Sequence, residues 1–303
     1  MTDLAVSIAG ISMSNPVLVA SGTFGYGAEY HPVFDVSRLG ALVTKGLTLR
    51  PCAGNPGRRL CETPAGLLNA IGLQNPGVEV FIGDILPAMR SYGVPVIANI
   101  AGATDEEYVA LAERLDGSGV AGLELNISCP NVQAGGMALG TDPCLAASVV
   151  AAVVQATSLP VIVKLTPNVT DIVGLARAVV DAGAAVLSLI NTLLGLAIDV
   201  ETGRPALGNI TGGLSGPAIR PVAVRAVWQV AQAVDVPIIG MGGICTGRDA
   251  LEFILAGASA VAVGSAFFHD PLAAVKIIED LERYCDRKGI ADWRTLIGAA
   301  WKS

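Results

Sequence analysis

The stretch G-L-E-L-N-I-S-C-P-N, residues 122–131, indicates both the fold and the chemistry of this chain. Its first half alternates apolar and polar residues as a β-strand does, and Pro130 ends the strand because proline has no amide hydrogen to donate. Asn126, Ser128 and Cys129 are therefore expected where a strand passes into a loop. A cysteine there, beside amides that can hold a polar ligand, has the chemistry of a base or nucleophile. A free cysteine is more often a small buried apolar residue, so both interpretations stay open at this point.

Composition sets the class of protein. The chain has 303 residues, of which 52% are hydrophobic and 15% charged, with a formal net charge of -7. This length suffices for one large core, so we expect a single domain over residues 1–303. An acidic chain without a basic run is a poor nucleic-acid binder. No apolar run approaches the roughly 20 residues of a membrane-spanning helix, and the N-terminus has no signal-peptide pattern. We therefore expect a soluble, cytoplasmic protein that binds neither nucleic acid nor membrane.

The cysteines argue against a metal centre within this chain. None of them forms a C-x-x-C pair, so neither a zinc site nor an iron–sulfur cluster is indicated. Scattered reduced thiols fit the cytoplasm. The six are Cys52, Cys61, Cys129, Cys144, Cys245 and Cys285.

Short β-rich runs alternate with stretches long enough for helices, after an entry hairpin that turns near Gly10. Several runs contain almost no polar residue, which is typical of strands buried on both faces. Eight such runs predict an α/β fold, a parallel (β/α)8 TIM barrel with an N-terminal hairpin and insertions at the C-terminal face. A doubly wound open sheet is less favoured because the glycine-rich turn it needs after the first strand is absent. The predicted strands are Val17 to Ala20, Ala41 to Thr44, Pro95 to Ile100, Gly122 to Ile127, Pro160 to Leu165, Ala185 to Ile190, Pro237 to Gly240 and Ala260 to Val263. The predicted helices are Glu106 to Leu115, Leu145 to Gln155, Ile172 to Ala182, Ala218 to Ala233, Arg248 to Ala256 and Leu272 to Arg287.

Every predicted strand ends in a hydrogen-bonding residue or a glycine. Barrel enzymes place their sites at these C-terminal ends. Two lysines on otherwise apolar strands are costly unless an anion meets them, so we expect a ligand site here. The residues are Ser21, Lys45, Gly46, Asn99, Asn126, Lys164, Asn191, Thr192, Gly242, Gly243, Gly264 and Ser265.

The same ends suggest what is bound. Glycines after the last two strands are typical of a barrel phosphate site, although glycine also serves in simple turns. Lys164 and Asn99 would face the body of a phosphorylated cofactor, and an ammonium beside a flavin stabilises its anionic reduced form. The insertion Glu62 to Gly77, with Asn69 and the amides of 71–73, suits a small planar substrate that carries carboxylate and amide groups.

Several ordered motifs resemble one family over nearly the whole chain. They are T-K-G-L-T-L-R-P with G-N-P, N-A-I-G-L-Q-N-P-G, N-I-S-C-P-N, K-L-T-P-N, I-N-T-L-L-G-L-A-I-D, and G-M-G-G-I with V-G-S-A-F. They resemble dihydroorotate dehydrogenase of class 1, specifically the catalytic subunit of its NAD-linked 1B type. Class 2 enzymes are less similar because they use a serine base and carry an N-terminal membrane extension. One departure, G-N-P-G-R-R, puts only the conformation of that loop in doubt.

The resemblance implies residue roles. Cys129 would be the catalytic base that removes a proton from carbon 5 of dihydroorotate while a hydride leaves carbon 6. The implied FMN contacts are Ser21, Lys45, Gly46, Asn99, Asn126, Lys164, Ile190, Gly216, Gly242, Gly243, Gly264 and Ser265. The implied substrate contacts are Lys45, Asn69, Ala70, Ile71, Gly72, Leu73, Asn126, Asn191 and Thr192.

It also implies a partner and a pathway. The chain would oxidise dihydroorotate to orotate in pyrimidine synthesis and pass electrons to a subunit that carries FAD and a 2Fe-2S cluster, in a heterotetramer built on a homodimer.

The loop Pro130 to Thr141 is interpreted as a lid, or else as a disordered connection. Neither His31 nor His269 lies on a strand end, so histidine is not expected as the base. A fumarate-using class 1A enzyme, a phosphosugar isomerase or aldolase, and a non-catalytic flavin-carrying barrel remain as alternatives.

Overall fold

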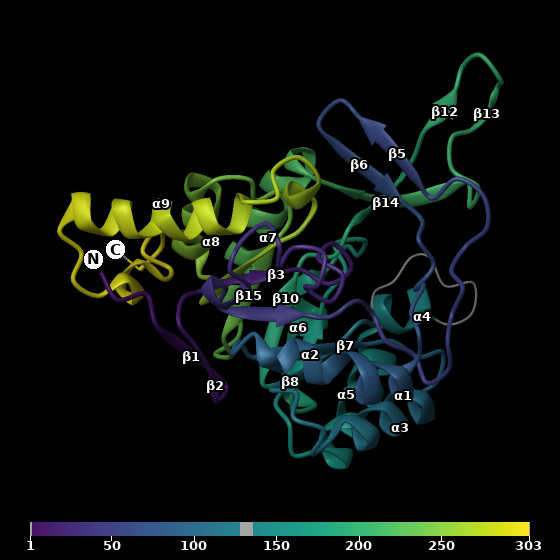
Figure 1. Ribbon diagram of the computed structural model, residues 1–303, viewed down its shortest axis with the longest axis horizontal. Helices are drawn as coiled ribbons and strands as arrows, with labels where there is room; N and C mark the ends of the chain where they lie inside the picture. The colour runs from purple at the N-terminus through teal and green to yellow at the C-terminus, as the bar shows by residue number, and fades with distance from the viewer. Residues whose placement is uncertain (1, 128–135, 303) are drawn as a thin grey trace.

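Eight parallel strands close into a barrel in the computed structural model, which describes residues 2–127 and 136–302. This confirms the predicted (β/α)8 architecture, and Figure 1 shows the barrel at the centre of the molecule. Every residue of these strands is buried, as expected for strands that are covered on both faces. The strands are β3 (Val17–Val19), β4 (Ala41–Val43), β7 (Val96–Ile100), β8 (Gly122–Leu125), β9 (Val161–Lys164), β10 (Val186–Leu189), β15 (Ile238–Met241) and β16 (Ala260–Val263). Pairing of β16 with β3 and of β10 with both β9 and β15 completes the circle.

An N-terminal hairpin closes the lower end of the barrel, where the strands have their N-terminal ends. Strands β1 (Val6–Ile8) and β2 (Ile11–Met13) pair antiparallel, and the turn between them contains Gly10 with φ of 85°, as predicted. The apolar side chains of this hairpin join the cluster inside the barrel. A Cβ on Gly122, the first residue of β8, would lie 3.0 Å from the Cδ1 of Ile11, so the hairpin contacts the strands at their N-terminal ends.

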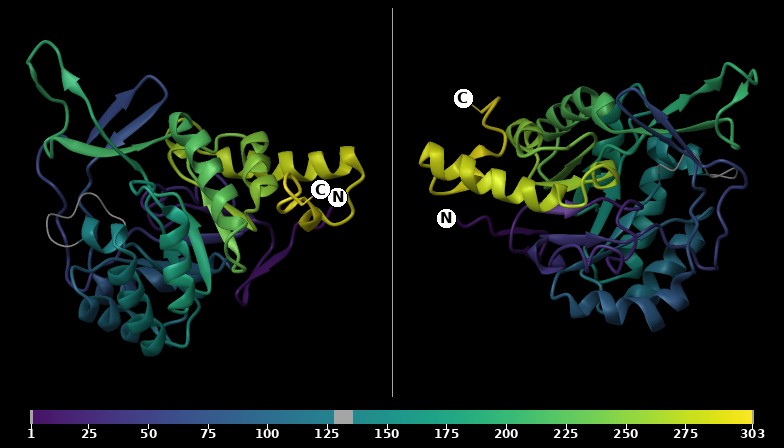
Figure 2. Two further views of the ribbon diagram at one scale, coloured as in Figure 1. Left: turned by 180° about the vertical axis from the view of Figure 1, so that it is seen from behind. Right: turned by 45° about the horizontal axis from the view of Figure 1, so that its top comes forward.

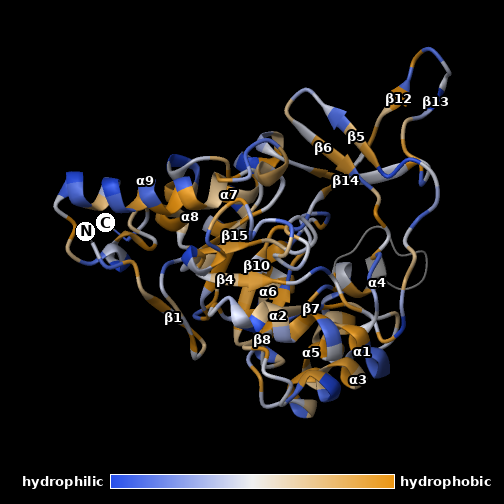
Figure 3. Ribbon diagram, viewed as in Figure 1, coloured by the Kyte–Doolittle hydropathy of each residue, from blue (hydrophilic) through white to orange (hydrophobic). Residues whose placement is uncertain are grey.

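Helices pack around the outside. The predicted helices are confirmed to within a few residues: α3 (Asp105–Leu115), α5 (Pro143–Ala156), α6 (Ile172–Asp181), α7 (Arg220–Ala231), α8 (Gly247–Ala256) and α9 (Ala273–Lys288). Side chains cap several N-termini, including Thr104 before α3 and Thr246 with Asp249 in a capping box at α8. Figure 3 shows the apolar colouring concentrated in the strands and on the helix faces turned toward them, with the outer face of α9 hydrophilic.

One helical segment was not predicted. Between β4 and β7 the chain forms α1 (Val78–Val80), η2 (Phe81–Ile85) and α2 (Leu86–Ser91). Gly83 and Pro87 suggest breaks in this stretch. The glycine, however, lies within η2, which is a short π-helix. The proline lies in the first turn of α2, where proline is tolerated. Burial of Phe81 and Met89 against the barrel stabilises the segment.

A small antiparallel sheet rises above the C-terminal end of the barrel. Its strands are β5 (Leu60–Thr63) and β6 (Gly66–Asn69) from the predicted insertion, with β11 (Leu193–Leu196) and β14 (Thr211–Ser215) from a second insertion after β10. Strand β6 pairs with β14, and a further hairpin, β12 (Ile198–Asp199) with β13 (Arg204–Pro205), projects beyond them. Figures 1 and 2 show this sheet on the side of the barrel away from β1 and β2. Its pairing across two distant insertions was not predicted.

The segment that follows β8 corrects one expectation. Gly136–Thr141 forms helix α4, so the end of the expected loop is helical, and the remainder of that loop lies outside the described residues. Among the helices that the structure describes, none is long and apolar enough to cross a membrane.

Candidate active site

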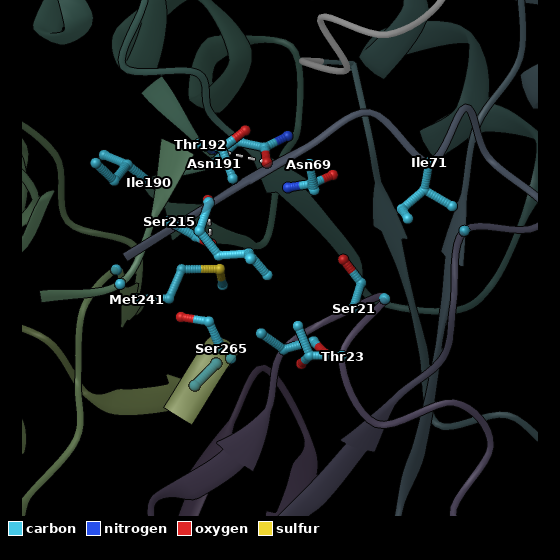
Figure 4. Close-up of a pocket in the computed structure, with 18 of the residues that line it drawn as sticks. Ser21, Thr23, Asn69, Ile71, Ile190, Asn191, Thr192, Ser215, Met241 and Ser265 are labelled. Atoms are coloured by element: carbon cyan, nitrogen blue, oxygen red, sulfur yellow. Dashed lines mark hydrogen bonds between the residues drawn. The ribbon is translucent and has the colours of Figure 1, made fainter. Parts of the chain in front are cut away.

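A cavity opens at the C-terminal end of the barrel, between the strand ends and the small sheet above them. Residues from the ends of all eight barrel strands line it, together with residues of the β5–β6 hairpin and of the loop that follows it. Figure 4 shows Ile190, Met241 and Ser265 from the barrel across the cavity from Ile71 of the insertion, with Asn69 and the barrel residue Ser21 on the side of Ile71. The cavity thus has two unlike walls, one from the barrel and one from the insertion.

The structure brings together nearly all of the predicted site residues. The described ones that line this cavity are Ser21, Lys45, Gly46, Asn69, Ile71, Gly72, Leu73, Asn99, Asn126, Lys164, Ile190, Asn191, Thr192, Gly216, Gly242, Gly243, Gly264 and Ser265. Cys129 lies outside the described residues. Ala70 is the exception, because it does not line the cavity.

Ala70 supports the insertion from behind. Its side chain is fully buried in a small apolar cluster with Leu68 and Leu207. Its backbone N–H donates to the carbonyl of Arg59 at 2.8 Å, and its carbonyl accepts from the Nδ2 of Asn55 at 3.1 Å. Both backbone groups are therefore engaged within the protein.

Two lysines give the cavity positive charge. Lys164, at the end of β9, is 5% exposed, and its Nζ donates to the Oγ of Ser21 at 3.0 Å. Burial lowers the pKa of the Lys45 ammonium, the positive charge of Arg59 lowers it further, and Glu29 opposes both. An anionic ligand would stabilise the charged form of both lysines, so this wall favours an anion.

A buried polar network lies beneath the lysines. The Nδ2 of Asn99 donates to the Oε2 of Glu124 at 2.6 Å, and the Oγ of Ser188 donates to its Oε1 at 2.7 Å. All three residues are at most 1% exposed. Sequence reasoning missed Glu124 and Ser188, although each is a polar residue in an otherwise apolar strand, G-L-E-L and V-L-S-L.

Glycines form a cradle at another part of the rim. Gly243 has φ of 77°, and a Cβ there would lie 2.6 Å from the carbonyl oxygen of Gly216, so a side chain is excluded on both counts. The carboxylate of Asp249 accepts from the backbone N–H groups of Cys245 at 3.0 Å and Thr246 at 2.9 Å, and it forms an ion pair with Arg220. The loop that follows β15 is thus held in one shape, with bare backbone facing the cavity.

Amides and a hydroxyl line another part of the cavity. The Nδ2 of Asn191 donates to the Oδ1 of Asn126 at 3.4 Å, and the Oδ1 of Asn191 accepts from the N–H of Thr192 at 2.9 Å. Asn69, at the end of β6, donates to the carbonyl of Gly213 on β14 at 3.2 Å, so the pairing of the two insertions fixes its position. These groups suit a small polar ligand.

Further lining residues were missed by sequence reasoning. They are Ala20, Gly22, Thr23, Leu60, Leu67, Ser215, Ile219, Met241, Ile244, Ala262 and Phe268. Ser215 and Leu67 come from β14 and β6, and only the tertiary pairing of these strands brings them here. Among the described residues, no group of three or more His, Cys, Asp or Glu side chains could hold a metal ion.

The cavity fits a phosphorylated, ring-bearing cofactor. The Oδ1 of Asn99 is buried and has no hydrogen-bond partner within the described part of the chain. A Cβ on Gly46 would lie 3.0 Å from this oxygen and 3.1 Å from the Cδ2 of Leu73, so the glycine leaves a hollow beside an open acceptor. The glycine cradle and the Lys164 ammonium supply the groups that a phosphate and an anionic ring need.

Comparisons with known proteins agree with this geometry. The family model described as dihydroorotate dehydrogenase matches residues 3–285. The dihydroorotate dehydrogenase B (NAD(+)) catalytic subunit of Desulforudis audaxviator is 61% identical over 300 residues, covering 99% of this chain and 98% of the relative. The protein of the same name from Geotalea uraniireducens is 60% identical over 298 residues, covering 98% of each. In fold, the crystal structure of DHODH in complex with ferulenol from Eimeria tenella is similar with a TM-score of 0.83 and 23% identity, covering 99% of this chain and 89% of that one. The chain therefore belongs to the dihydroorotate dehydrogenase family.

Proposed function

We propose that this chain is the catalytic subunit of an NAD-linked dihydroorotate dehydrogenase, which oxidises dihydroorotate to orotate with FMN in pyrimidine synthesis. The observation that carries the proposal is the cavity with two unlike walls. The barrel contributes a glycine cradle, two lysines and the Asn191 amide, and the insertion contributes the Asn69 amide. Such a site can hold a phosphorylated cofactor and a small polar substrate side by side.

The barrel residues would hold the cofactor. The cradle at Gly243 and Gly264 would take the phosphate, while Lys164 and Asn99 would contact the ring. The full set proposed for FMN is Ser21, Lys45, Gly46, Asn99, Asn126, Lys164, Ile190, Gly216, Gly242, Gly243, Gly264 and Ser265. When bound, FMN accepts the hydride that leaves carbon 6 of dihydroorotate.

Residues of the insertion, together with residues at the ends of the barrel strands, would orient the substrate. Lys45 would pair with the substrate carboxylate, and the amides of Asn69, Asn126 and Asn191 would hydrogen-bond its ring. Ile71, Gly72, Leu73 and Thr192 complete the proposed set. Fixing the substrate against the cofactor removes the entropy cost of bringing the two together. Cys129 would remove the proton from carbon 5 as general base.

Electrons would then leave through a second protein. The relatives are named catalytic subunits, which implies a separate electron-transfer subunit for this chain. We propose that this partner carries FAD and a 2Fe-2S cluster, and that two copies of each subunit form a heterotetramer around a homodimer of this chain. The sequence has no glycine-rich dinucleotide fingerprint after a strand, so NAD itself would be reduced on the partner. We propose a cytoplasmic location.

An assay of the isolated chain tests this proposal. The purified chain, free of any other subunit, is mixed anaerobically with dihydroorotate and either a dye acceptor or NAD. We expect bleaching of the flavin absorbance and turnover with the dye, and negligible reduction of NAD. Efficient NAD reduction by this chain alone would refute the two-subunit proposal, and a colourless protein that cannot be loaded with FMN would refute the flavin chemistry.

A further inference from the structure

Glu124 is a buried carboxylate that the proposed chemistry leaves without a role. It lies on β8 with its side chain inside the barrel, 1% exposed. Each of its oxygens accepts one short hydrogen bond, from the Nδ2 of Asn99 on β7 and from the Oγ of Ser188 on β10. Three barrel strands therefore converge on one carboxylate. A buried carboxyl group is costly, and an apolar residue would fill this space more cheaply if packing were its only purpose.

The carboxylate decides which way the Asn99 amide points. Both oxygens of Glu124 accept hydrogen bonds, so the Asn99 amide turns its NH2 group toward Glu124. The amide oxygen then points the other way. That oxygen, Oδ1, is buried beside Gly46 at the edge of the cavity and has no partner among the residues described. Asn99 thus presents an acceptor, and not a donor, to whatever occupies the cavity.

We propose that Glu124 is a positioning residue for the cofactor: it locks Asn99 as a hydrogen-bond acceptor, so that the bound FMN must offer a donor at this point. Ser188 fixes the carboxylate in turn by occupying its second oxygen. The inference rests on the proposed function, because it takes FMN as the occupant. It adds Glu124 and Ser188 to the machinery of the site, although neither lines the cavity.

The proposal can be tested by placing a second carboxylate against Glu124. In Asn99→Asp, the two acids lie within hydrogen-bond distance and must share one proton. While the two acids share a proton, the introduced carboxyl group can hydrogen-bond to Glu124 as the Asn99 amide does, with its other oxygen toward the cavity. When that proton is lost, the two negative charges repel each other. The FMN affinity of the Asn99→Asp apoprotein is measured by quenching of FMN fluorescence. Relative to wild type, it should fall by roughly tenfold as the pH rises from about 6 to about 9.

Adding Glu124→Gln should remove this new pH dependence. The introduced glutamine amide can donate to the introduced aspartate, whose second oxygen then faces the cavity at every pH in this range. The matched control is Asn69→Asp, which adds the same charge to the same cavity at a residue bonded to Gly213 and not to Glu124. Its pH profile of FMN affinity should be unchanged when Glu124→Gln is added. Melting temperatures of the apoproteins report whether each variant is folded.

The outcomes separate the inference from the function on which it rests. Wild-type chain that does not bind FMN overturns the proposed function. If the wild-type chain binds FMN, two results would overturn the role of Glu124 alone. One is a pH profile of FMN affinity for Asn99→Asp that follows wild type. The other is an Asn99→Asp profile that stays unchanged when Glu124→Gln is added. An equal effect of Glu124→Gln on the Asn69→Asp control also overturns it, because the carboxylate would then act through its charge and not through Asn99.

Discussion

The two ends of the barrel are built from the same strands but serve opposite purposes. In β9, Ile162 belongs to the apolar cluster inside the barrel, and two residues later Lys164 lines the cavity. In β7 the same spacing separates Ile97 from Asn99. Because side chains alternate along a strand, both members of each pair point inward and differ only in height. One step of two residues thus takes the barrel from a packed core to a ligand site.

The closures of the two ends also differ. Below, the β1–β2 hairpin inserts Ile8, Ile11 and Met13 into the barrel interior, where they add to buried apolar area. Above, the β5–β6 hairpin covers the barrel but leaves a cavity lined with lysines and amides. The lower end therefore stabilises the fold, whereas the upper end gives up some of that stability for binding. Three sets of substitutions test this division between the two ends.

The largest effect is expected from Cys129→Ala. We expect FMN to remain bound while turnover of dihydroorotate falls by about 10²–10⁴-fold, since a positioned general base contributes that much. Cys129→Ser should keep some activity only at higher pH, because a hydroxyl is a much weaker acid than a thiol. Steady-state assays with a dye acceptor measure both. The exposed Cys144 provides the control Cys144→Ala, which should behave as wild type. Rates near wild type for Cys129→Ala at neutral pH would exclude it as the base.

At the lower end, Ile11→Ala should damage stability and spare catalysis. Ile11 is 4% exposed, and truncating a buried aliphatic side chain leaves a cavity that costs about 2–5 kcal/mol. Urea unfolding should show this loss, while the KM for dihydroorotate and the turnover of the folded fraction stay unchanged. Ser12→Ala, on the exposed side of the same hairpin, should change neither quantity. A raised KM with normal stability would break the division between the two ends.

A smaller effect is expected from the lysines. Lys164→Ala should weaken FMN binding by about tenfold, the value of one hydrogen bond to a charged group. The apoprotein should not be destabilised in proportion, because the substitution also removes a buried charge. Lys45→Ala should raise the KM for dihydroorotate as well, because this lysine is proposed to touch both ligands. Fluorescence titration, kinetics and thermal melting of the two variants provide the comparison. Unchanged FMN affinity in both would show that the upper end does not hold the cofactor as proposed.

Local sequence pattern was sufficient for much of the molecule. A short apolar run such as Ala260–Val263 is buried on both faces wherever it lies, so the strands could be predicted one at a time. Polar residues directly after such runs, Lys164 and Asn191 among them, must come to the same rim once the strands are parallel. The helical segment 78–91 could not be predicted in this way, because its glycine and proline suggest breaks. Only packing of Phe81 against the barrel offsets them.

The barrel and the residues at its upper rim can therefore be predicted from sequence alone, since both depend on patterns only a few residues long. Tertiary structure decided which of those residues meet. Strands β6 and β14 pair although Asn69 and Gly213 are 144 residues apart, and this pairing builds the second wall of the cavity. The bonds from Asn99 and Ser188 to Glu124 depend on the stagger among four consecutive strands, β7 to β10, because β9 lies between Glu124 and Ser188. That stagger is set by closing the whole barrel, and no single strand encodes it.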